Sequence, residues 1–183
     1  MNDKVTYNAK GKNNSSLNTF LLGKNQPDIF TLLTFRMAFY CSILMVFWNL
    51  FSWFAFSYGW TLEESKGIPI GQLIEARAQH FGFTLNNYQS KLTQHFLIST
   101  FSWLISLIYV FLLYRKNPFF ILVMFVGHSI YLLSAFLLLG YNFFLEDIGW
   151  LEKLALLVSH VSGWISWILQ RNERRGISIF KTD

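Results

Sequence analysis

Charged residues are scarce in this chain of 183 residues. Only 14% of them are Asp, Glu, Lys or Arg, whereas a soluble domain of this size normally carries about 25%. Hydrophobic residues make up 53% of the chain and aromatic residues 19%, and they are gathered in long blocks. The scarcity of charge excludes an ordinary soluble domain, and the apolar blocks predict an integral membrane protein.

Other features are also missing. Cys41 is the single cysteine, so no disulfide can form within one chain and the redox compartment cannot be inferred. Residues 1–19 contain no apolar run, so we expect no cleavable signal peptide. The sequence has no H-E-x-x-H motif, nucleophile motif or glycine-rich phosphate loop. We therefore predict that the protein is not an enzyme.

The longest apolar block runs from Phe119 to Leu139, 21 residues without a formal charge. As a helix it would be roughly 31 Å long, close to the ~30 Å hydrocarbon core of a bilayer. Asn117 can cap its first turn, Pro118 suits the first helical position, and Gly140 offers a left-handed stop. With the similar blocks around it, this block predicts an all-α polytopic membrane protein. Its four transmembrane helices would form a bundle, with spans at about 29–58, 95–114, 118–140 and 150–170.

Polar segments flank and separate these spans. Residues 1–28 are predicted to be a polar cytoplasmic tail, residues 171–183 a basic cytoplasmic tail, and residues 29–170 the membrane domain. Residues 71–82 are amphipathic, and we expect them to form a short interfacial helix on the outer side. Its apolar side would lie against lipid or the bundle and comprises Leu73, Ile74, Ala78 and Phe81.

Lys and Arg residues are distributed unequally between the two sides of the predicted membrane domain. Ten lie on the side of the termini and four on the other, so the positive-inside rule predicts that both termini are cytoplasmic. The protein would then be a multi-pass protein of the cell inner (plasma) membrane. Topology explains the net charge of +5, so we expect no sequence-specific nucleic-acid binding. The ten are Lys4, Lys10, Lys12, Lys24, Arg115, Lys116, Arg171, Arg174, Arg175 and Lys181, and the four are Lys66, Arg77, Lys91 and Lys153.

Two histidines lie at equal depth in the third and fourth predicted spans. His128 follows Asn117 by eleven residues and His160 precedes Arg171 by eleven, so both imidazoles should lie ~16 Å from the cytoplasmic helix ends. Polar groups at this depth are costly unless paired, so both should face the bundle interior. Three roles are open: a hydrogen bond between helices, a proton relay or pore lining, and ligation of b-type haem. Close packing at ~8–10 Å favours the first, because a haem between the histidines requires wider separation.

Other polar residues in the spans form stripes at helical spacing. His95, Ser99, Ser102, Ser106 and Tyr109 recur at intervals of 4, 3, 4 and 3 residues. Such stripes predict a polar bundle interior, which fits helix packing, a narrow hydrated path or self-association. Arg36 lies two turns inside its span and can snorkel to the near interface. The remaining intramembrane candidates are Asn49, Tyr131, Ser162, Gly163 and Ser166.

A candidate metal-binding set occurs on the outer side of the predicted membrane domain. Glu75, His80 and His95 are its members, together with Glu63 and Glu64. Their spacing matches no known metal-binding motif. We therefore favour a solvated loop and expect no bound metal.

Two resemblances to known families bear on function. In span number, length, and Asn, Lys, Phe and Ile content, the chain resembles the small four-pass accessory membrane protein of type VI-B CRISPR loci. This resemblance implies a membrane component that modulates an RNA-guided antiviral ribonuclease. The segment DIFTLLTFRMAFY, residues 28–40, is similar to the first helix of the horizontally transferred transmembrane domain of vitamin-K-dependent carboxylase relatives. Phe35 and Arg36 carry this second likeness, and no catalytic residues of that family are matched.

Together these features predict a non-enzymatic multi-pass protein of the lipid bilayer. It would act as an accessory or regulatory component through a protein partner or self-association, in antiviral defence or as a pore. The alternative is a redox membrane subunit that binds b-type haem or quinone through His128 and His160. The first interpretation requires no cofactor.

Overall fold

The computed structural model describes residues 29–66 and 70–174, and the side chains of residues 29–58 and 71–173. All regular structure in these ranges is helical, so the protein is all-α as predicted. The predicted tails and the candidates Glu63 and Glu64 lie outside the described side chains. The elements are α2 (Ile29–Lys66), α3 (Ile70–His80), α4 (Leu85–Tyr114), α5 (Phe120–Ser134), the π-helix η1 (Ala135–Leu139), α6 (Gly140–Glu146) and α7 (Trp150–Arg174).

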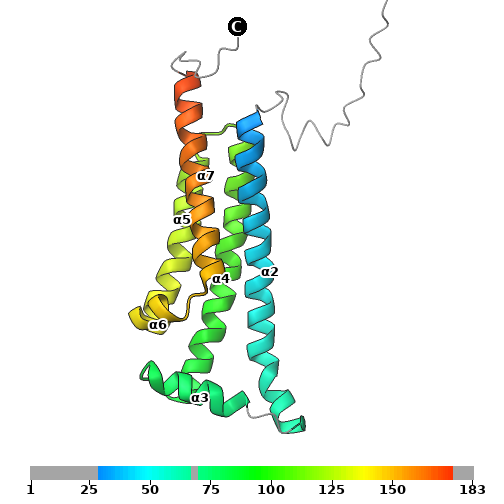
Figure 1. Ribbon diagram of the computed structural model, residues 1–183, viewed down its shortest axis with the longest axis vertical. Coiled ribbons are helices and arrows are strands. Elements are labelled where there is room, and N and C mark those ends of the chain that lie inside the picture. Colours follow the sequence, from blue (N-terminus) through cyan, green and yellow to red (C-terminus); the bar gives the residue numbers. More distant parts are fainter. Residues whose placement is uncertain (1–28, 67–69, 175–183) are drawn as a thin grey trace, which may run out of the picture.

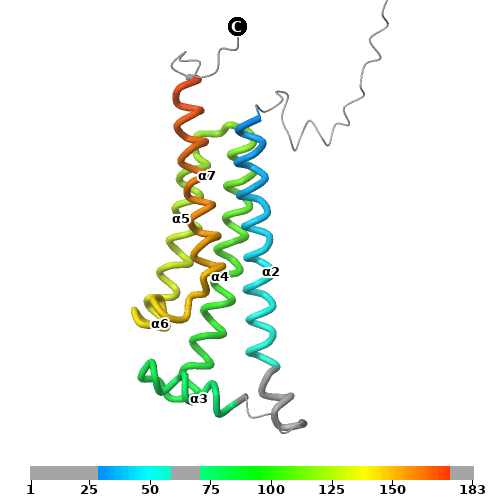
Figure 2. Tube along the Cα trace, in the orientation of Figure 1, coloured from blue at the N-terminus to red at the C-terminus, as the bar shows by residue number. Residues whose placement is uncertain are grey.

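The long helices α2, α4, α5 and α7 form an elongated bundle (Figure 1). In this bundle α2 packs against α4 and α7, and α5 packs against the same two helices. The first residues of α2 and the last residues of α7 lie at one end, and α3 lies across the opposite end against α2 and α4 (Figure 2). The bundle therefore has one end near the basic α4–α5 turn and one end covered by α3.

Three stretches are long and apolar enough to cross a membrane: Ile29–Tyr58, Leu85–Tyr114 and Phe120–Glu146. Their outward-facing side chains are apolar as well. Along α2 the exposed residues Leu33, Met37, Tyr40, Leu44, Phe47 and Phe51 recur every three or four positions. Because water would disfavour so large an apolar surface, it is the face that lipid covers. The described residues thus form an all-α structure with three helices that could cross a membrane.

Helix α7 has the opposite pattern, with its polar residues on the inner face. Its buried residues include Ser159, Ser162, Ser166 and Gln170, whereas Leu157, Val161, Trp164 and Ile168 are exposed. Within the described residues it is not one of the helices that qualify as a span by composition. The predicted span 150–170 is therefore present as a helix, and its low average hydropathy comes from the polar face packed against α2 and α5.

Several predicted boundaries differ from the structure. The sequence predicts that the second span begins at about His95, but α4 begins ten residues earlier, at Leu85. The first turns of α4 follow Thr84 and are amphipathic, with Tyr88 and Leu92 buried. Asn117 does cap the next helix, since its Oδ1 accepts a hydrogen bond from the Phe119 amide at 3.0 Å. The third span continues through η1 to Gly140, whose φ is +88°, and the predicted connection 141–149 is largely the short helix α6.

The amphipathic segment 71–82 matches a helix, α3, which ends two residues before Gly82 with φ +76°. Its apolar residues do not all lie on a covered side. Ala78 is buried, and Ile74 and Phe81 pack against the core. Leu73, however, is 74% exposed, so the bundle does not cover it.

Small residues allow the helices to approach closely. A Cβ atom added to Gly127 of α5 would lie 3.2 Å from both the Ser102 carbonyl oxygen and Ser106 Oγ of α4. On α7, a Cβ added to Gly163 would collide with Met124 of α5. Gly163 belongs to the polar and small-residue candidates of the sequence, whereas Gly127 was not among them.

Candidate functional site

The bundle interior contains a continuous set of polar side chains. Every member of the α4 stripe is buried: His95, Ser99, Ser102, Ser106 and Tyr109. The α2 residues Ser42, Asn49 and Ser52 and the α7 residues Ser159, Ser162 and Ser166 are buried too. Because these stripes come from different helices, the interior is polar along most of its length.

Hydrogen bonds account for part of this polar interior. Ser102 Oγ donates to the Gly127 carbonyl at 2.5 Å, which joins α4 to α5. Ser166 Oγ donates to Thr34 Oγ1 at 2.8 Å, which joins α7 to α2. Asn49 instead bonds within its own helix, since Nδ2 donates to the Met45 carbonyl at 2.7 Å. The small polar residues thus connect neighbouring helices at two levels.

The predicted histidine pair is brought together. The ring centroids of His128 and His160 lie 4.5 Å apart, with the planes inclined at 38°. His128 is 1% exposed and also contacts the rings of Trp103 and Tyr109. The contact between the two imidazoles is therefore ring against ring, inside an aromatic cluster.

The two histidines differ in their hydrogen bonds. His160 Nδ1 is 2.8 Å from the Leu156 carbonyl oxygen of its own helix. Neither ring nitrogen of His128 has a hydrogen-bond partner in the described part of the chain. Trp103 Nε1 and Ser159 Oγ share that property. Buried polar groups normally find a partner, so this section of the interior is unusual.

A b-type haem does not fit between His128 and His160 in this arrangement. An iron atom ligated from both sides must lie between two imidazoles that point their nitrogens at it. Here the two rings contact each other at 4.5 Å between centroids, and Met124 fills the space beside Gly163. The haem alternative would require α5 and α7 to separate.

A second polar region lies at the end of the bundle, beside α3. A cavity of about 440 Å³ opens there between α2, α3, α4, the α6–α7 segment and the first turn of α7. Its walls are mostly apolar and aromatic, with a few polar groups that converge on it. The polar and charged lining residues are Ser52, Arg77, Tyr88, His95, Asp147 and Glu152.

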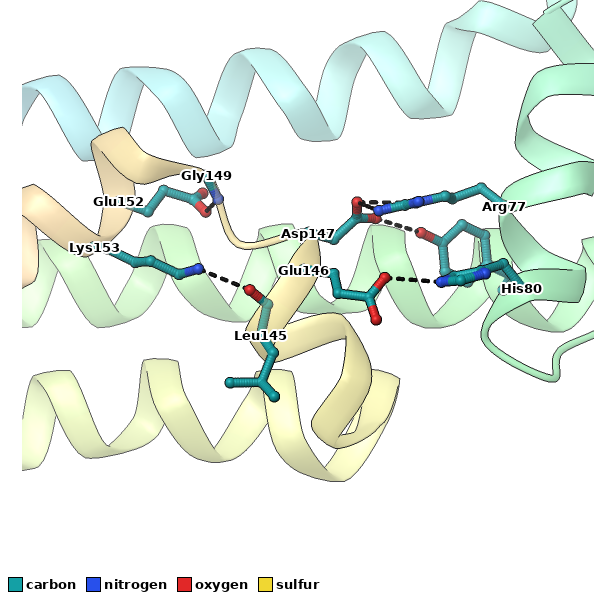
Figure 3. A network of polar contacts seen from close by, with 9 residues as sticks. Arg77, His80, Leu145, Glu146, Asp147, Gly149, Glu152 and Lys153 are labelled. Carbon is teal, nitrogen blue, oxygen red and sulfur yellow. Dashed lines mark hydrogen bonds and ion pairs between the residues drawn. The ribbon is translucent and has the colours of Figure 1, made fainter.

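Ion pairs hold α3 over this cavity (Figure 3). Arg77 of α3 donates to Asp147 Oδ1 in a salt bridge, with Nε at 3.0 Å. Tyr88 of α4 donates to the other oxygen of Asp147 at 3.2 Å. The hydrogen bond with Asp147 raises the pKa of the Arg77 guanidinium, which stays protonated at all ordinary pH values. His80 Nε2 lies 2.8 Å from Glu146 Oε2, so α3 is tied to the end of α6 at two points.

Glu152 is the buried carboxylate of the cavity. It lies in the first turn of α7, is 6% exposed, and accepts a hydrogen bond from the Gly149 amide at 3.1 Å through Oε2. This is the reach-back contact of a capping box, in which a Glu in the first turn binds the amide that precedes the helix. Lys153 is its neighbour in sequence, but Lys153 Nζ donates to the Leu145 carbonyl at 2.9 Å (Figure 3).

The outer-side candidates do not form a common metal site. His95 is buried in the cavity wall, where Nδ1 lies 2.9 Å from Ser134 Oγ. His80 pairs with Glu146, and Glu75 accepts from Gln79 at 3.5 Å on the exposed side of α3. Among the described residues, no group of three or more His, Cys, Asp or Glu side chains could hold a metal ion. Arg36 is exposed on the lipid-facing side of α2, as a snorkelling residue would be.

Of the polar residues that line the cavity, sequence reasoning singled out His95 as a site candidate but missed Asp147 and Glu152. Asp147 and Arg77 are 70 positions apart, so no local pattern connects them. Trp48 lines the cavity and Trp103 belongs to the packed core. Both lie in apolar blocks of the sequence, which do not distinguish a cavity wall from a core. The spacing Gly149-x-x-Glu152 was the one available signal, because it is typical of a helix start with a reach-back carboxylate.

No family model matches the chain, and no curated protein or solved structure is significantly similar to it. The geometry of the cavity and of the histidine pair therefore carries the functional inference.

Proposed function

We propose that this protein crosses the membrane four times and acts as a non-enzymatic regulatory component that binds a small amphipathic ligand at its outer end. The cavity of about 440 Å³ carries the proposal. Ligand sites in proteins have volumes of roughly 300–1,000 Å³ and combine apolar walls with a few convergent polar groups. This cavity has that size and that composition.

The fourth crossing is proposed for α7. Its 25 residues correspond to roughly 37 Å of helix, enough for a bilayer core. It packs between α2 and α5, so its serines and Gln170 face protein and its exposed side is apolar. A helix with this arrangement has the surface that a span needs, even though its average hydropathy is modest.

The orientation is proposed from the positions of the basic residues. Arg115, Lys116 and Arg171 belong to the ends of α4 and α7 that lie away from α3. By the positive-inside rule that end is cytoplasmic, so α3 and the cavity face the outside. In this orientation α3 lies where an interfacial helix is expected, with the exposed Leu73 available to lipid.

A regulatory role follows from the way α3 covers the cavity. Leu73, Ile74 and Arg77 of α3 line the cavity, while Arg77 and His80 tie the helix to Asp147 and Glu146. A ligand in the cavity that contacts α3 would weaken or strengthen the contacts of Arg77 with Asp147 and of His80 with Glu146. Either effect alters the outer surface that a partner protein or a second copy of the chain would meet.

Binding of 4-phenylbutan-1-ol, a neutral amphiphile of suitable size, tests the proposal. We expect saturable calorimetric binding to the protein in nanodiscs, above the partitioning seen with empty nanodiscs. Ser52→Phe, which fills the cavity, and Leu73→Trp, which narrows it from the rim, should each remove the saturable part. Ser90→Phe, at an exposed position of α4 outside the cavity lining, is the matched control and should bind like the unmodified protein. Binding that is no greater than partitioning would overturn the proposal.

A second candidate function is proton movement through the bundle interior. The observation that favours it is His128, whose two nitrogens lack hydrogen-bond partners in the described chain beside His160. An imidazole in this state can take up and release a proton if water reaches it. A pH-jump assay in liposomes tests this function, with His128→Phe expected to stop the flux and lipid-facing Trp164→Phe expected to leave it unchanged.

A further inference from the structure

We propose that the cavity under α3 selects an organic cation with an apolar body, and that the Glu152 carboxylate is its counter-ion. This inference rests on the proposed function, because it names the chemical class of the ligand that the cavity takes. Three observations carry it: the lack of a cationic partner for Glu152, the net charge of the cavity lining, and the aromatic side chains in the cavity walls.

Glu152 has no cationic partner within the described residues. It is 6% exposed and lines the cavity, yet no Lys, Arg or His forms an ion pair with it there. The adjacent Lys153 directs its ammonium group to the Leu145 carbonyl. The groups that contact the carboxylate, the Gly149 amide and the side chains of Tyr131 and Trp48, are all uncharged. A buried carboxylate is costly without a counter-charge, so a cationic ligand would supply what the protein does not.

The remaining charges of the cavity do not favour an anion. Arg77 is the cation of the lining, and Asp147 already neutralises it through a direct ion pair. With Glu152 ionised, the lining carries two carboxylates and one guanidinium, a net charge of −1. An anionic ligand would have to break the Arg77–Asp147 pair and would still face Glu152.

The walls fit the apolar body and the charge of such a ligand. Trp48, Phe56, Phe96 and Phe143 line the cavity with Tyr88. The faces of aromatic rings attract cations. A hydrated metal ion would find few oxygen ligands among these walls, whereas an alkylammonium group finds a carboxylate and rings together. The cavity chemistry therefore points to an organic cation.

The alternative role of Glu152 is to cap α7 and do nothing more. Glu152→Gln separates the two roles, because Gln can also accept from the N-cap amide in a capping box but cannot neutralise a cation. Glu146→Gln is the matched control. It removes one negative charge from the same region, but Glu146 is half exposed and does not line the cavity.

The experiment compares three ligands that share a phenylbutyl body. They are trimethyl(4-phenylbutyl)ammonium, 4-phenylbutan-1-ol and 4-phenylbutane-1-sulfonate, titrated calorimetrically into the protein in phosphatidylglycerol nanodiscs against empty nanodiscs. We expect the ammonium compound to bind more tightly than the alcohol, and the sulfonate not to bind above partitioning. Glu152→Gln should weaken ammonium binding by about tenfold or more, in line with the strength of close charge pairs, and should leave alcohol binding unchanged. Glu146→Gln should change neither the affinity for the ammonium compound nor the affinity for the alcohol by more than about twofold, as expected for an exposed charge.

The outcomes separate this inference from the proposed function. Equal binding of the three compounds, or equal effects of Glu152→Gln and Glu146→Gln, would overturn the cation inference while alcohol binding still upheld the cavity. If the unmodified protein also failed to bind the alcohol above partitioning, both the cation inference and the proposed function would be overturned. Including phosphatidylcholine in the nanodiscs distinguishes the source of the cation. Weaker binding of the ammonium probe there supports capture of lipid headgroups, and unchanged binding supports a free organic cation.

Discussion

The middle of the bundle and its outer end handle polar groups in different ways. In the middle, serines and glycines let helices approach closely, and the histidine pair lies in ring contact. At the outer end, charged residues surround a cavity of about 440 Å³ and α3 covers it through ion pairs. Polar residues inside a membrane bundle can therefore serve packing at one level and binding at another. In the interior, serines bond to neighbouring helices, whereas at the outer end several polar residues line a cavity.

The largest effect should come from adding volume to the middle of the bundle. Gly127→Ala places a Cβ 3.2 Å from the Ser102 carbonyl, which is backbone of the facing helix and cannot move aside by itself. We expect a loss of about 1–3 kcal/mol in the free energy of unfolding, measured by denaturant titration in mild detergent micelles.

Gly149→Ala is the matched substitution at the outer end. The added methyl group would meet only Glu152 Oε2, at 3.9 Å. Its cost should stay below about 0.5 kcal/mol, as at positions without special packing. Equal costs at the two glycines would show that the outer end is packed as tightly as the middle, contrary to the comparison drawn above.

The histidine pair should show a smaller, coupled effect. His128→Ala and His160→Ala each remove one imidazole ring and with it the ring contact. The coupling energy from a double-mutant cycle should be about 0.5–1.5 kcal/mol, the range for aromatic pairs. Thermal unfolding of the two single variants and the double variant gives this quantity. Strict additivity would mean that the 4.5 Å ring contact contributes nothing to the middle of the bundle.

Removing the ion pair that holds α3 should have a modest effect on global stability and a clear local one. Arg77→Met keeps the aliphatic stem and removes the charge that binds Asp147. Because the Arg77 side chain is 41% exposed, we expect a loss of at most about 1 kcal/mol. Amide exchange within α3 should become faster, while exchange in α4 from Phe101 to Tyr109 should not change.

The smallest effect belongs to the opposite end of the molecule. Lys116 Nζ lies 3.0 Å from both carboxylate oxygens of Glu173; the Lys116 side chain is 35% exposed and that of Glu173 is 52% exposed. Glu173→Gln should cost less than about 0.5 kcal/mol, and added salt should reduce even that cost. A larger loss than for Arg77→Met would reverse the ranking of the two ends.

The sequence predicted the middle of the molecule better than its outer end, for a physical reason. Helical spacing determines which side of a helix a residue occupies, so the burial of Ser102, Ser106 and Ser166 and the contact of His128 with His160 could be expected from spacing alone. Ion pairs such as Arg77–Asp147 depend on how distant segments meet. The cavity depends on where side chains fail to fill space, and no local pattern encodes that.

Helix boundaries were missed for a related reason. A hydropathy pattern shows where a span must be apolar, but it does not show where a helix continues into polar sequence. Helix α4 therefore begins at Leu85, ahead of the apolar block. The role of His80 depends on a distant partner, Glu146, which became visible only in three dimensions.

The π-helix η1 has a consequence for the direction of the chain beyond it. Tyr131, Ala135 and Leu139 are all buried and follow one another at intervals of four residues. In an ideal α-helix such residues rotate by about 40° per step, whereas the wider turn of a π-helix absorbs this rotation. With a regular α-helix over Ala135–Leu139, Leu139 and the segment after it would be turned by about 40° from their present direction. Glu146 and Asp147 would then point away from α3, so the phase of one widened turn determines whether the cavity has a cover.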